Sequence, residues 1–338
     1  MPETTPAPTR ALTTDTRTLG ETGITVSALG VGTWAWGDTA FWGYGSTYTR
    51  ADAAAAFRAS VNAGINLFDT AEIYGRGTSE RLLGSFAHTI ASPNAPLVLA
   101  SKFAPLPNRW SVKKAVPEML DRTLARLGVE QIGLYQIHWP VPWAKSDDLM
   151  DALATAVHAG KVRAVGVSNY TGKMMHRAHA RLATHGVPLA SNQVQYSLLH
   201  RTPETNGVLE ACRELNVALI AYSPLAQGVL TARYANGEIG KLSGPRRFSR
   251  RWSAKGREEL RPLTTMLQEI AAAHEKTVEQ VALNWLLSVD PRVIPIPGAK
   301  RATQATANAG ALGWRLTDTE LATLAGLTTG HRRSFPPI

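Results

Sequence analysis

The chain has 338 residues, of which 44% are apolar, and this length is sufficient for an α/β barrel built as one domain. No run of 18 uncharged apolar residues is present, which excludes a membrane-spanning helix. The single cysteine, Cys212, excludes an internal disulfide and a cysteine-rich metal site, whereas the net charge of +10 makes nucleic acid a partner to consider.

The opening residues, 1–15, lack the apolar core of a secretory signal, and we expect them to form a disordered tail. Residues 16–338 are expected to form a single domain that starts with a β-hairpin at 16–27. Apolar, β-branched runs that end in polar side chains are typical of buried parallel strands. Eight such runs follow, at 28–34, 66–70, 97–103, 132–138, 162–168, 189–196, 218–224 and 292–298.

Helical patterns lie at 52–64, 79–88, 111–127, 147–159, 172–184, 207–216, 258–275 and 302–310, with two more at 278–288 and 317–327. Thr49 with Asp52, Ser111, and Thr317 with Glu320 are predicted to cap three of these helices. Alternation of eight strands with eight helices predicts a (β/α)8 TIM barrel with an amino-terminal β-hairpin and extra carboxyl-terminal helices. Cys212 lies in a helical pattern and is expected to be a buried structural thiol.

Residues 30–35, GVGTWA, match the glycine fingerprint of a dinucleotide-binding Rossmann unit, and Asp52 follows about 20 residues later. That fingerprint requires a helix that begins inside the motif. Residues 34–46 are instead rich in glycine and tryptophan and have no helical period. We therefore favour a strand end followed by a long aromatic loop.

Three polar residues end consecutive predicted strands: Asp69, Lys102 and His138. Because the carboxyl ends of barrel strands converge on one mouth, these side chains should face one another, and Tyr74 can reach the same space from the next loop. A buried cation lowers the pKa of a nearby phenol, and an ion pair with Asp69 would keep Lys102 charged. The four residues predict a proton-transfer site in which His138 orients a carbonyl oxygen.

A general acid alone reduces nothing, and we find no metal-ligand cluster or nucleophile elbow, so the electrons are expected from a bound cofactor. Ser168, Asn169 and Gln193 can hold a nicotinamide carboxamide, and the ring of Tyr222 can stack on the nicotinamide. Residues that can reach a pyrophosphate or an adenosine 2′-phosphate follow the last two strands. They are Ser223, Leu225, Gln227, Gly228, Gly298, Lys300, Arg301, Gln304 and Asn308.

Much of the positive charge lies in residues 241–261, where eight Lys or Arg side chains accompany two glutamates. This pattern predicts either a solvated loop or, over 241–257, a flap that covers a polyanionic ligand. No zinc-finger, helix-turn-helix or single-strand-binding signature is present, so nucleic acid is not expected as the primary partner.

Taken in order, these segments resemble the aldo-keto reductase family over essentially the whole chain. FDTAEIYG at 68–75, ASKF at 100–103, QIHWP at 136–140 and VGVSNY at 165–170 are similar to its catalytic and cofactor segments. GTWAWGDTAFW and IPIPGAKRATQATANAGALGW are similar to chloroplast and cyanobacterial-type members, including pyridoxal reductase-like proteins. The resemblance implies a carbonyl reductase with NADPH as cofactor, Tyr74 as proton donor, Lys102 and Asp69 as its tuning pair, and His138 as the orienting donor.

Two positions depart from the family pattern: Gly298 replaces a frequent lysine and Gln304 a frequent arginine, so recognition of the 2′-phosphate falls on Lys300 or Arg301. The resemblance also implies an aromatic substrate pocket. Trp34, Phe103 and Trp139 are its expected walls, with Trp36, Trp42, Trp110 and Trp143 nearby. For Trp139 and Trp143, packing in the core is an equal alternative. We expect a small-molecule carbonyl substrate, a cytoplasmic location and no membrane partner, with a monomer as one option. A nicotinamide-sensing regulatory subunit with little turnover is the alternative function.

Overall fold

The computed structural model describes residues 15–90, 96–109, 111–238, 242 and 249–328. The predicted tail at 1–15 therefore lies, except for Asp15, outside the described residues. Asp15 accepts hydrogen bonds from Arg17 and from Arg315, near the other end of the described chain. The extent of the domain, 16–338, stays a prediction.

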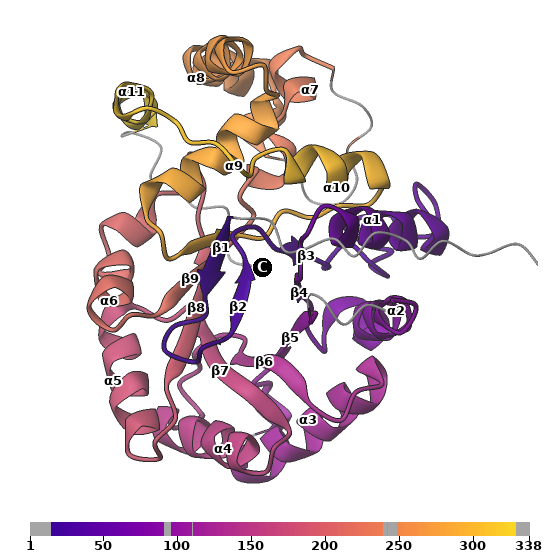
Figure 1. The fold of residues 1–338 in the computed structure, drawn as a ribbon, viewed down its shortest axis with the longest axis vertical. Helices are drawn as coiled ribbons and strands as arrows, with labels where there is room; N and C mark the ends of the chain where they lie inside the picture. Colours follow the sequence, from indigo (N-terminus) through magenta and orange to yellow (C-terminus); the bar gives the residue numbers. More distant parts are fainter. Residues whose placement is uncertain (1–14, 91–95, 110, 239–241, 243–248, 329–338) are drawn as a thin grey trace, which may run out of the picture.

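Eight parallel strands form the centre of the fold, and each pairs with its neighbours in chain order from β3 to β10. Figure 1 shows these strands curled around a common axis, with helices on the outside. All eight lie within the predicted ranges, although most are shorter. They are β3 (Val31–Gly32), β4 (Leu67–Asp69), β5 (Val98–Phe103), β6 (Ile132–Ile137), β7 (Val162–Ser168), β8 (Leu189–Gln195), β9 (Ala218–Tyr222) and β10 (Val293–Pro295).

The sheet closes into a barrel where β3 meets the segment that contains β10. The amide of Gly30 donates to the Pro295 carbonyl oxygen at 3.0 Å, and the amide of Gly32 to that of Pro297 at 3.2 Å. A Cβ atom on Gly32 would lie only 2.9 Å from the Ile296 carbonyl oxygen. The glycines therefore allow this close approach, and the next helix begins at Arg50 rather than inside the motif, which excludes the Rossmann interpretation.

The predicted hairpin is present as β1 (Thr16–Thr18) and β2 (Thr25–Ser27), and it covers the amino end of the barrel. Its apolar side chains, such as Leu19, Ile24 and Val26, are buried in one cluster with inward-facing strand residues, such as Leu134 and Ile220. Figure 1 shows the hairpin in front of the barrel opening. Because polar side chains such as Lys102 follow this apolar layer along the strands, the chemistry is confined to the opposite, carboxyl end.

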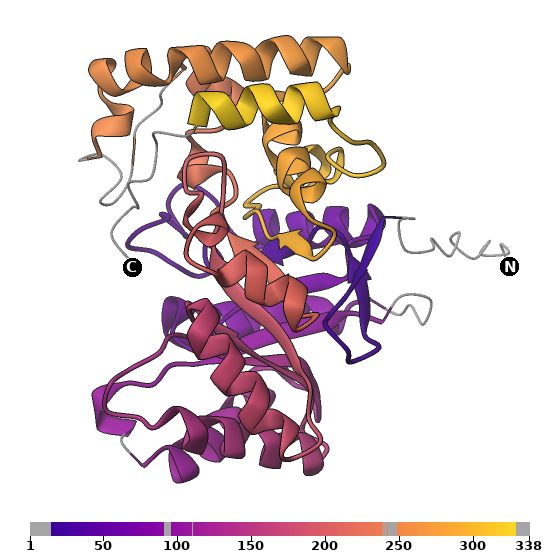
Figure 2. The same cartoon turned by 90° about the vertical axis from the view of Figure 1, so that its left-hand side faces the viewer.

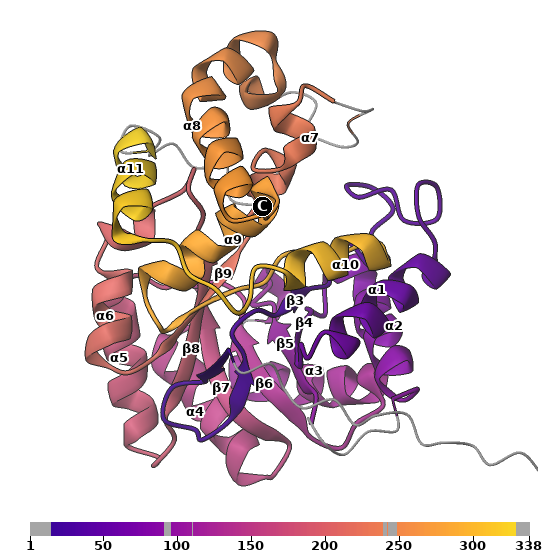
Figure 3. The same cartoon turned by 45° about the horizontal axis from the view of Figure 1, so that its top comes forward.

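Several helices bury their apolar faces against the outer side of the sheet. All the described α-helices lie outside the barrel. They are α1 (Arg50–Asn62), α2 (Thr78–Ala87), α3 (Val112–Leu127), α4 (Ser146–His158), α5 (Gly172–Ala183), α6 (Val208–Glu214), α7 (Ala232–Ala235), α8 (Ala254–Ala273), α9 (Val278–Val289), α10 (Ala302–Ala309) and α11 (Asp318–Thr328). The short α7 was not predicted. Figures 2 and 3 show α8 and α11 packed together at one side of the barrel. Of the two helices predicted to be extra, α11 lies in this pair, whereas α9 contacts β10.

Local capping explains where several helices begin. Thr49 and Asp52 form the predicted reciprocal capping box of α1, and Thr317 and Glu320 exchange the same contacts before α11. Ser111 occupies the N-cap position of α3, as predicted, but its side chain makes no capping hydrogen bond. Cys212 is fully buried in α6, as expected. None of the described helices is long and apolar enough to cross a membrane.

Candidate active site

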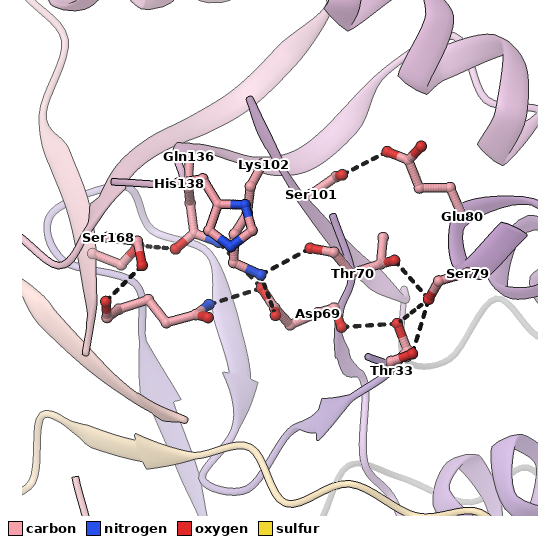
Figure 4. A network of polar contacts seen from close by, with 12 residues as sticks. Thr33, Asp69, Thr70, Ser79, Glu80, Ser101, Lys102, Gln136, His138 and Ser168 are labelled. Atoms are coloured by element: carbon pink, nitrogen blue, oxygen red, sulfur yellow. Dashed lines mark hydrogen bonds and ion pairs between the residues drawn. The ribbon is translucent and has the colours of Figure 1, made fainter. Parts of the chain in front are cut away.

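A buried ion pair lies at the carboxyl end of the barrel strands. Lys102 Nζ donates to Asp69 Oδ2 at 2.5 Å and to the Thr70 carbonyl oxygen at 2.9 Å. The other carboxylate oxygen of Asp69 accepts from Gln193 Nε2 at 2.8 Å and from Gln136 Nε2 at 3.2 Å. Figure 4 shows this network. Because two charges out of water need further hydrogen bonds, the two amides and the carbonyl make the buried pair tolerable.

Tyr74 and His138 lie beside this pair, so the structure brings the four predicted catalytic residues together. Lys102 Nζ is 5.1 Å from the centre of the Tyr74 ring, and the His138 ring is 5.8 Å from that ring, edge to face. Both rings keep some contact with solvent at the mouth. Gly75 and Arg76, which follow Tyr74, have φ angles of 53° and 54° and turn the chain sharply there.

The predicted lowering of the Tyr74 pKa is wrong for this structure. Burial raises the pKa of Tyr74 above its ordinary value, and the charge of Asp69 raises it further. Lys102 does not reverse this shift because the carboxylate of Asp69 lies against it and offsets its field at the phenol. Burial also lowers the pKa of His138, and the charge of Lys102 adds to that effect. Phenol and imidazole are therefore both neutral near pH 7.

Three polar side chains that support the ion pair were missed in the sequence. Gln136 is fully buried inside β6, two residues before His138. Thr33 donates through its hydroxyl to the Asp69 carbonyl oxygen at 3.0 Å, and Ser79 shares a hydrogen bond with Thr33 at 2.8 Å. The position of Gln136 was a usable signal, because alternation along a strand places residues 136 and 138 on the same face.

The residues predicted for the nicotinamide end lie around the same mouth. Ser168 Oγ donates to the Gln193 carbonyl oxygen at 2.8 Å, which joins the ends of β7 and β8. Asn169 is exposed, has a φ of 61° and accepts a hydrogen bond from the Tyr222 hydroxyl at 3.1 Å. The amide of Asn169 donates to the His138 carbonyl oxygen at 3.1 Å. These contacts hold the predicted amide and aromatic groups close to His138.

The loop after β9 has an unusual backbone. Among the described non-glycine residues, seven have positive φ, and three of them, Ser223, Ala226 and Gln227, lie in this loop. Gly228 follows with a φ of 103°, and the half-buried Leu225 lies between these positions. Such conformations cost free energy and concentrate at binding sites. The binding of a ligand by this loop stays a prediction.

The last predicted binding segment lies between β10 and α10. Arg301 Nη2 donates to the Thr47 carbonyl oxygen at 2.5 Å, and Gln304 Oε1 accepts from the Lys300 amide at 2.8 Å. Gly298 is exposed, whereas Asn308 is buried and donates to the Gly298 carbonyl oxygen at 3.4 Å. Asn308 thus supports the loop from beneath rather than presenting its amide to the surface.

Two of the three predicted pocket residues lie at the mouth. The ring of Trp34 is 6.2 Å from that of Tyr74, and the ring of Trp139 is 4.5 Å from that of His138. The prediction that Phe103 lines the pocket is wrong. Phe103 is fully buried on the outer side of the sheet, with the Arg109 guanidinium over its ring. Trp36 is also fully buried. Alternation along β5 explains the result for Phe103, because Lys102 faces inward.

The structure describes only part of the basic segment, residues 241–261. Most of 241–248 and Trp110 lie outside the described residues, so the flap remains a prediction. From Ser249 onward the chain is described, and Trp252 lies against Gly228 and against the ring of Tyr234, at 5.2 Å between ring centres. The described end of the basic segment therefore contacts the loop after β9.

Known proteins share this fold and sequence. Residues 28–328 match the aldo/keto reductase family. The chain is 40% identical over 307 residues to the chloroplastic pyridoxal reductase of Arabidopsis thaliana, covering 88% of this chain and 82% of that protein. An aldo-keto reductase of Schizosaccharomyces pombe named for NADP(+) is 31% identical, with coverage of 81% and 82%. The glycerol dehydrogenase structure from Gluconobacter oxydans has a TM-score of 0.78 at 27% identity, covering 97% and 99%. The expected resemblance is confirmed, and the chain belongs to the aldo/keto reductase family of oxidoreductases.

Proposed function

We propose that this protein uses NADPH to reduce aldehydes and ketones to alcohols. The observation that carries the proposal is a neutral phenol, Tyr74, held at a solvent-accessible mouth beside a buried Lys102–Asp69 pair and a neutral imidazole, His138. Relatives named as a pyridoxal reductase and as an NADP(+) enzyme support the carbonyl substrate and the cofactor.

The side chains around the mouth fit a nicotinamide cofactor. The exposed amide of Asn169 and the neighbouring Gln193 suit a carboxamide, and the half-buried ring of Tyr222 suits a flat ring. Residues 223–228 would hold a pyrophosphate, and Lys300 or Arg301 would meet a 2′-phosphate. When bound, this cofactor supplies a hydride, with its two electrons, to the carbonyl carbon of the substrate.

The protein's own residues would supply and control the proton. His138, kept neutral by burial, donates a hydrogen bond to the carbonyl oxygen and orients it toward Tyr74. As negative charge develops on that oxygen, it becomes a far stronger base than a phenolate, so Tyr74 transfers its proton in spite of its raised pKa. The phenolate that remains lies near the Lys102 ammonium, whose attraction Asp69 partly offsets, until solvent at the mouth returns a proton.

The test is the variant Tyr74→Phe, which removes the proton and leaves the ring. We expect turnover of para-nitrobenzaldehyde to fall by about 10²–10⁴-fold, the usual contribution of a general acid, while NADPH still binds. Tyr135→Phe, on β6 but buried on the outer side of the sheet, is the matched control and should keep normal turnover. Absorbance and fluorescence of NADPH report turnover and binding.

Two results would contradict the proposal. Substantial turnover by Tyr74→Phe would remove this residue from its proposed role. If wild-type protein binds NADPH but oxidises it with no member of an aldehyde and ketone panel that includes pyridoxal, the nicotinamide-sensing alternative is favoured instead. A cytoplasmic location, the absence of a nucleic-acid partner and the oligomeric state stay predictions.

A further inference from the structure

The aromatic loop at 33–49, between β3 and α1, is tied to the segment between β10 and α10. Trp36 Nε1 donates to the Ala299 carbonyl oxygen at 2.8 Å, and Arg301 Nη2 to that of Thr47 at 2.5 Å. Lys300 adds a third connection, because its Nζ donates to the Trp42 carbonyl oxygen at 3.0 Å. The aromatic loop is therefore anchored on a segment that is distant in the sequence.

The Lys300 ammonium also lies over two aromatic rings. Its Nζ is 4.7 Å from the centre of the Trp42 ring and 4.8 Å from that of Tyr48. Both distances are within the range in which the negative face of a ring attracts a cation. The side chain thus holds Trp42 by its backbone carbonyl and by its ring together, which fixes the orientation of that indole.

Trp42 in turn contacts the residues that line the mouth. Its ring meets Trp34 edge to face at 5.3 Å and Phe41 at 4.9 Å between ring centres. The ring of Trp34 stacks on Phe41 at 4.8 Å and lies 6.2 Å from the ring of Tyr74. A continuous series of ring contacts therefore runs from the ammonium of Lys300 to the proposed proton donor.

From this series we infer that Lys300 is a positioning residue for the carbonyl substrate: by holding Trp42, it keeps Trp34 in place as the wall beside Tyr74. The inference deepens the proposed function, on which it rests. It assigns to Lys300 a role that differs from contact with a 2′-phosphate. Loss of a residue that binds the 2′-phosphate weakens binding only of the cofactor that carries this phosphate. Loss of a positioning residue weakens binding of a bulky carbonyl substrate whichever cofactor is bound.

The variant Lys300→Met separates the two roles because it keeps the length of the side chain and removes its charge. We expect KM for para-nitrobenzaldehyde to rise about tenfold, equivalent to about 1.4 kcal/mol, with NADPH and with NADH alike. KM for propanal, which is too small to need the Trp34 wall, should change little, and so should kcat. Lys300→Arg should restore KM for the aromatic aldehyde, since a guanidinium also binds ring faces.

Lys276→Met is the matched control, because Lys276 Nζ lies 5.9 Å from the centre of the Trp314 ring, and that ring contacts His274 rather than Trp34 or Tyr74. It should leave both aldehydes unaffected. An increase confined to KM for NADPH, or equal increases for both aldehydes, would overturn the positioning role. Near-UV circular dichroism gives a readout that needs no turnover: Lys300→Met should lose intensity from the indole cluster, and Lys276→Met should lose less.

These readouts keep the two proposals distinguishable. If the wild type reduces no aldehyde, the proposed function fails, and the dichroism alone then decides whether Lys300 orders Trp42 and Trp34. An unchanged spectrum in Lys300→Met would overturn the inference whether or not the protein is a reductase.

Discussion

Breaking the buried Lys102–Asp69 pair from its two sides should destabilise the protein with opposite dependences on pH. Both side chains are buried, with 0% and 3% of their surface exposed. Lys102→Met leaves a buried carboxylate, and Asp69→Asn leaves a buried ammonium. Removing one partner of such a pair costs about 3–5 kcal/mol of the free energy of unfolding, because the remaining charge is uncompensated.

The sign of each pH dependence follows from the charge that remains. In Lys102→Met, burial should raise the pKa of Asp69 above its unfolded value, so the folded state gains a proton and the variant recovers stability as pH falls. In Asp69→Asn, the pKa of Lys102, which burial already lowers, should fall further, so this variant recovers stability as pH rises.

Urea unfolding followed by tryptophan fluorescence, at about pH 6 and about pH 9, measures both effects relative to wild type. Arg122→Met is the control, because Arg122 and Glu118 form an exposed pair, with 61% and 58% of their side-chain surface accessible. The free energy of unfolding of Arg122→Met should fall by less than about 0.5 kcal/mol at either pH. Equal pH slopes for the two buried-pair variants would refute the reasoning, as would losses below about 1 kcal/mol.

Two further predictions concern stability and reactivity. Gly32→Ala should destabilise the barrel by roughly 1–3 kcal/mol, because its Cβ would lie 2.9 Å from the Ile296 carbonyl oxygen, whereas Gly326→Ala on α11 meets no atom within 4 Å and should not. Urea unfolding compares the stabilities of the two variants, and equal values would contradict the close approach of Gly32 to Ile296 where the barrel closes. Burial raises the pKa of the Cys212 thiol to about 12, so its thiolate fraction should be about 10³-fold below that of an ordinary thiol. Iodoacetamide should therefore label Cys212 only on unfolding, and rapid labelling of the folded protein would contradict its burial.

The barrel was predictable because its polar residues occur at regular places in the sequence. Asp69, Lys102 and His138 each lie at or next to the carboxyl end of an apolar strand, and parallel strands bring such ends together whatever the lengths of the loops between them. The capping boxes at Thr49 and Thr317 were predictable for a similar reason, because their partners lie three residues away.

Other features depend on distances that the sequence does not contain. The pKa direction of Tyr74 depends on how deeply the phenol is buried and on how close the charge of Asp69 lies to it. Gly30 and Gly32 matched a nucleotide-binding fingerprint in the sequence. Their actual partner where the barrel closes, Ile296, is more than 260 residues away and could not be identified from the motif. The contact of Lys300 with Trp42 spans a similar separation and could not be inferred from either segment alone. The assignment of Phe103 to the pocket was an avoidable error. Adjacent residues of a strand point to opposite faces, so Phe103 and Lys102 could not both face the mouth.

The amino-terminal hairpin has a consequence for the order of events during turnover. The apolar side chains of the hairpin fill the amino end of the barrel within the described residues. In the proposed reaction, a proton that replaces the one lost from Tyr74 would therefore arrive through the same opening that admits the carbonyl compound. Replenishment of the phenol would then wait until the alcohol has departed. Water, substrate and product would all pass through this one opening, and its width would limit the rate at which each of them passes.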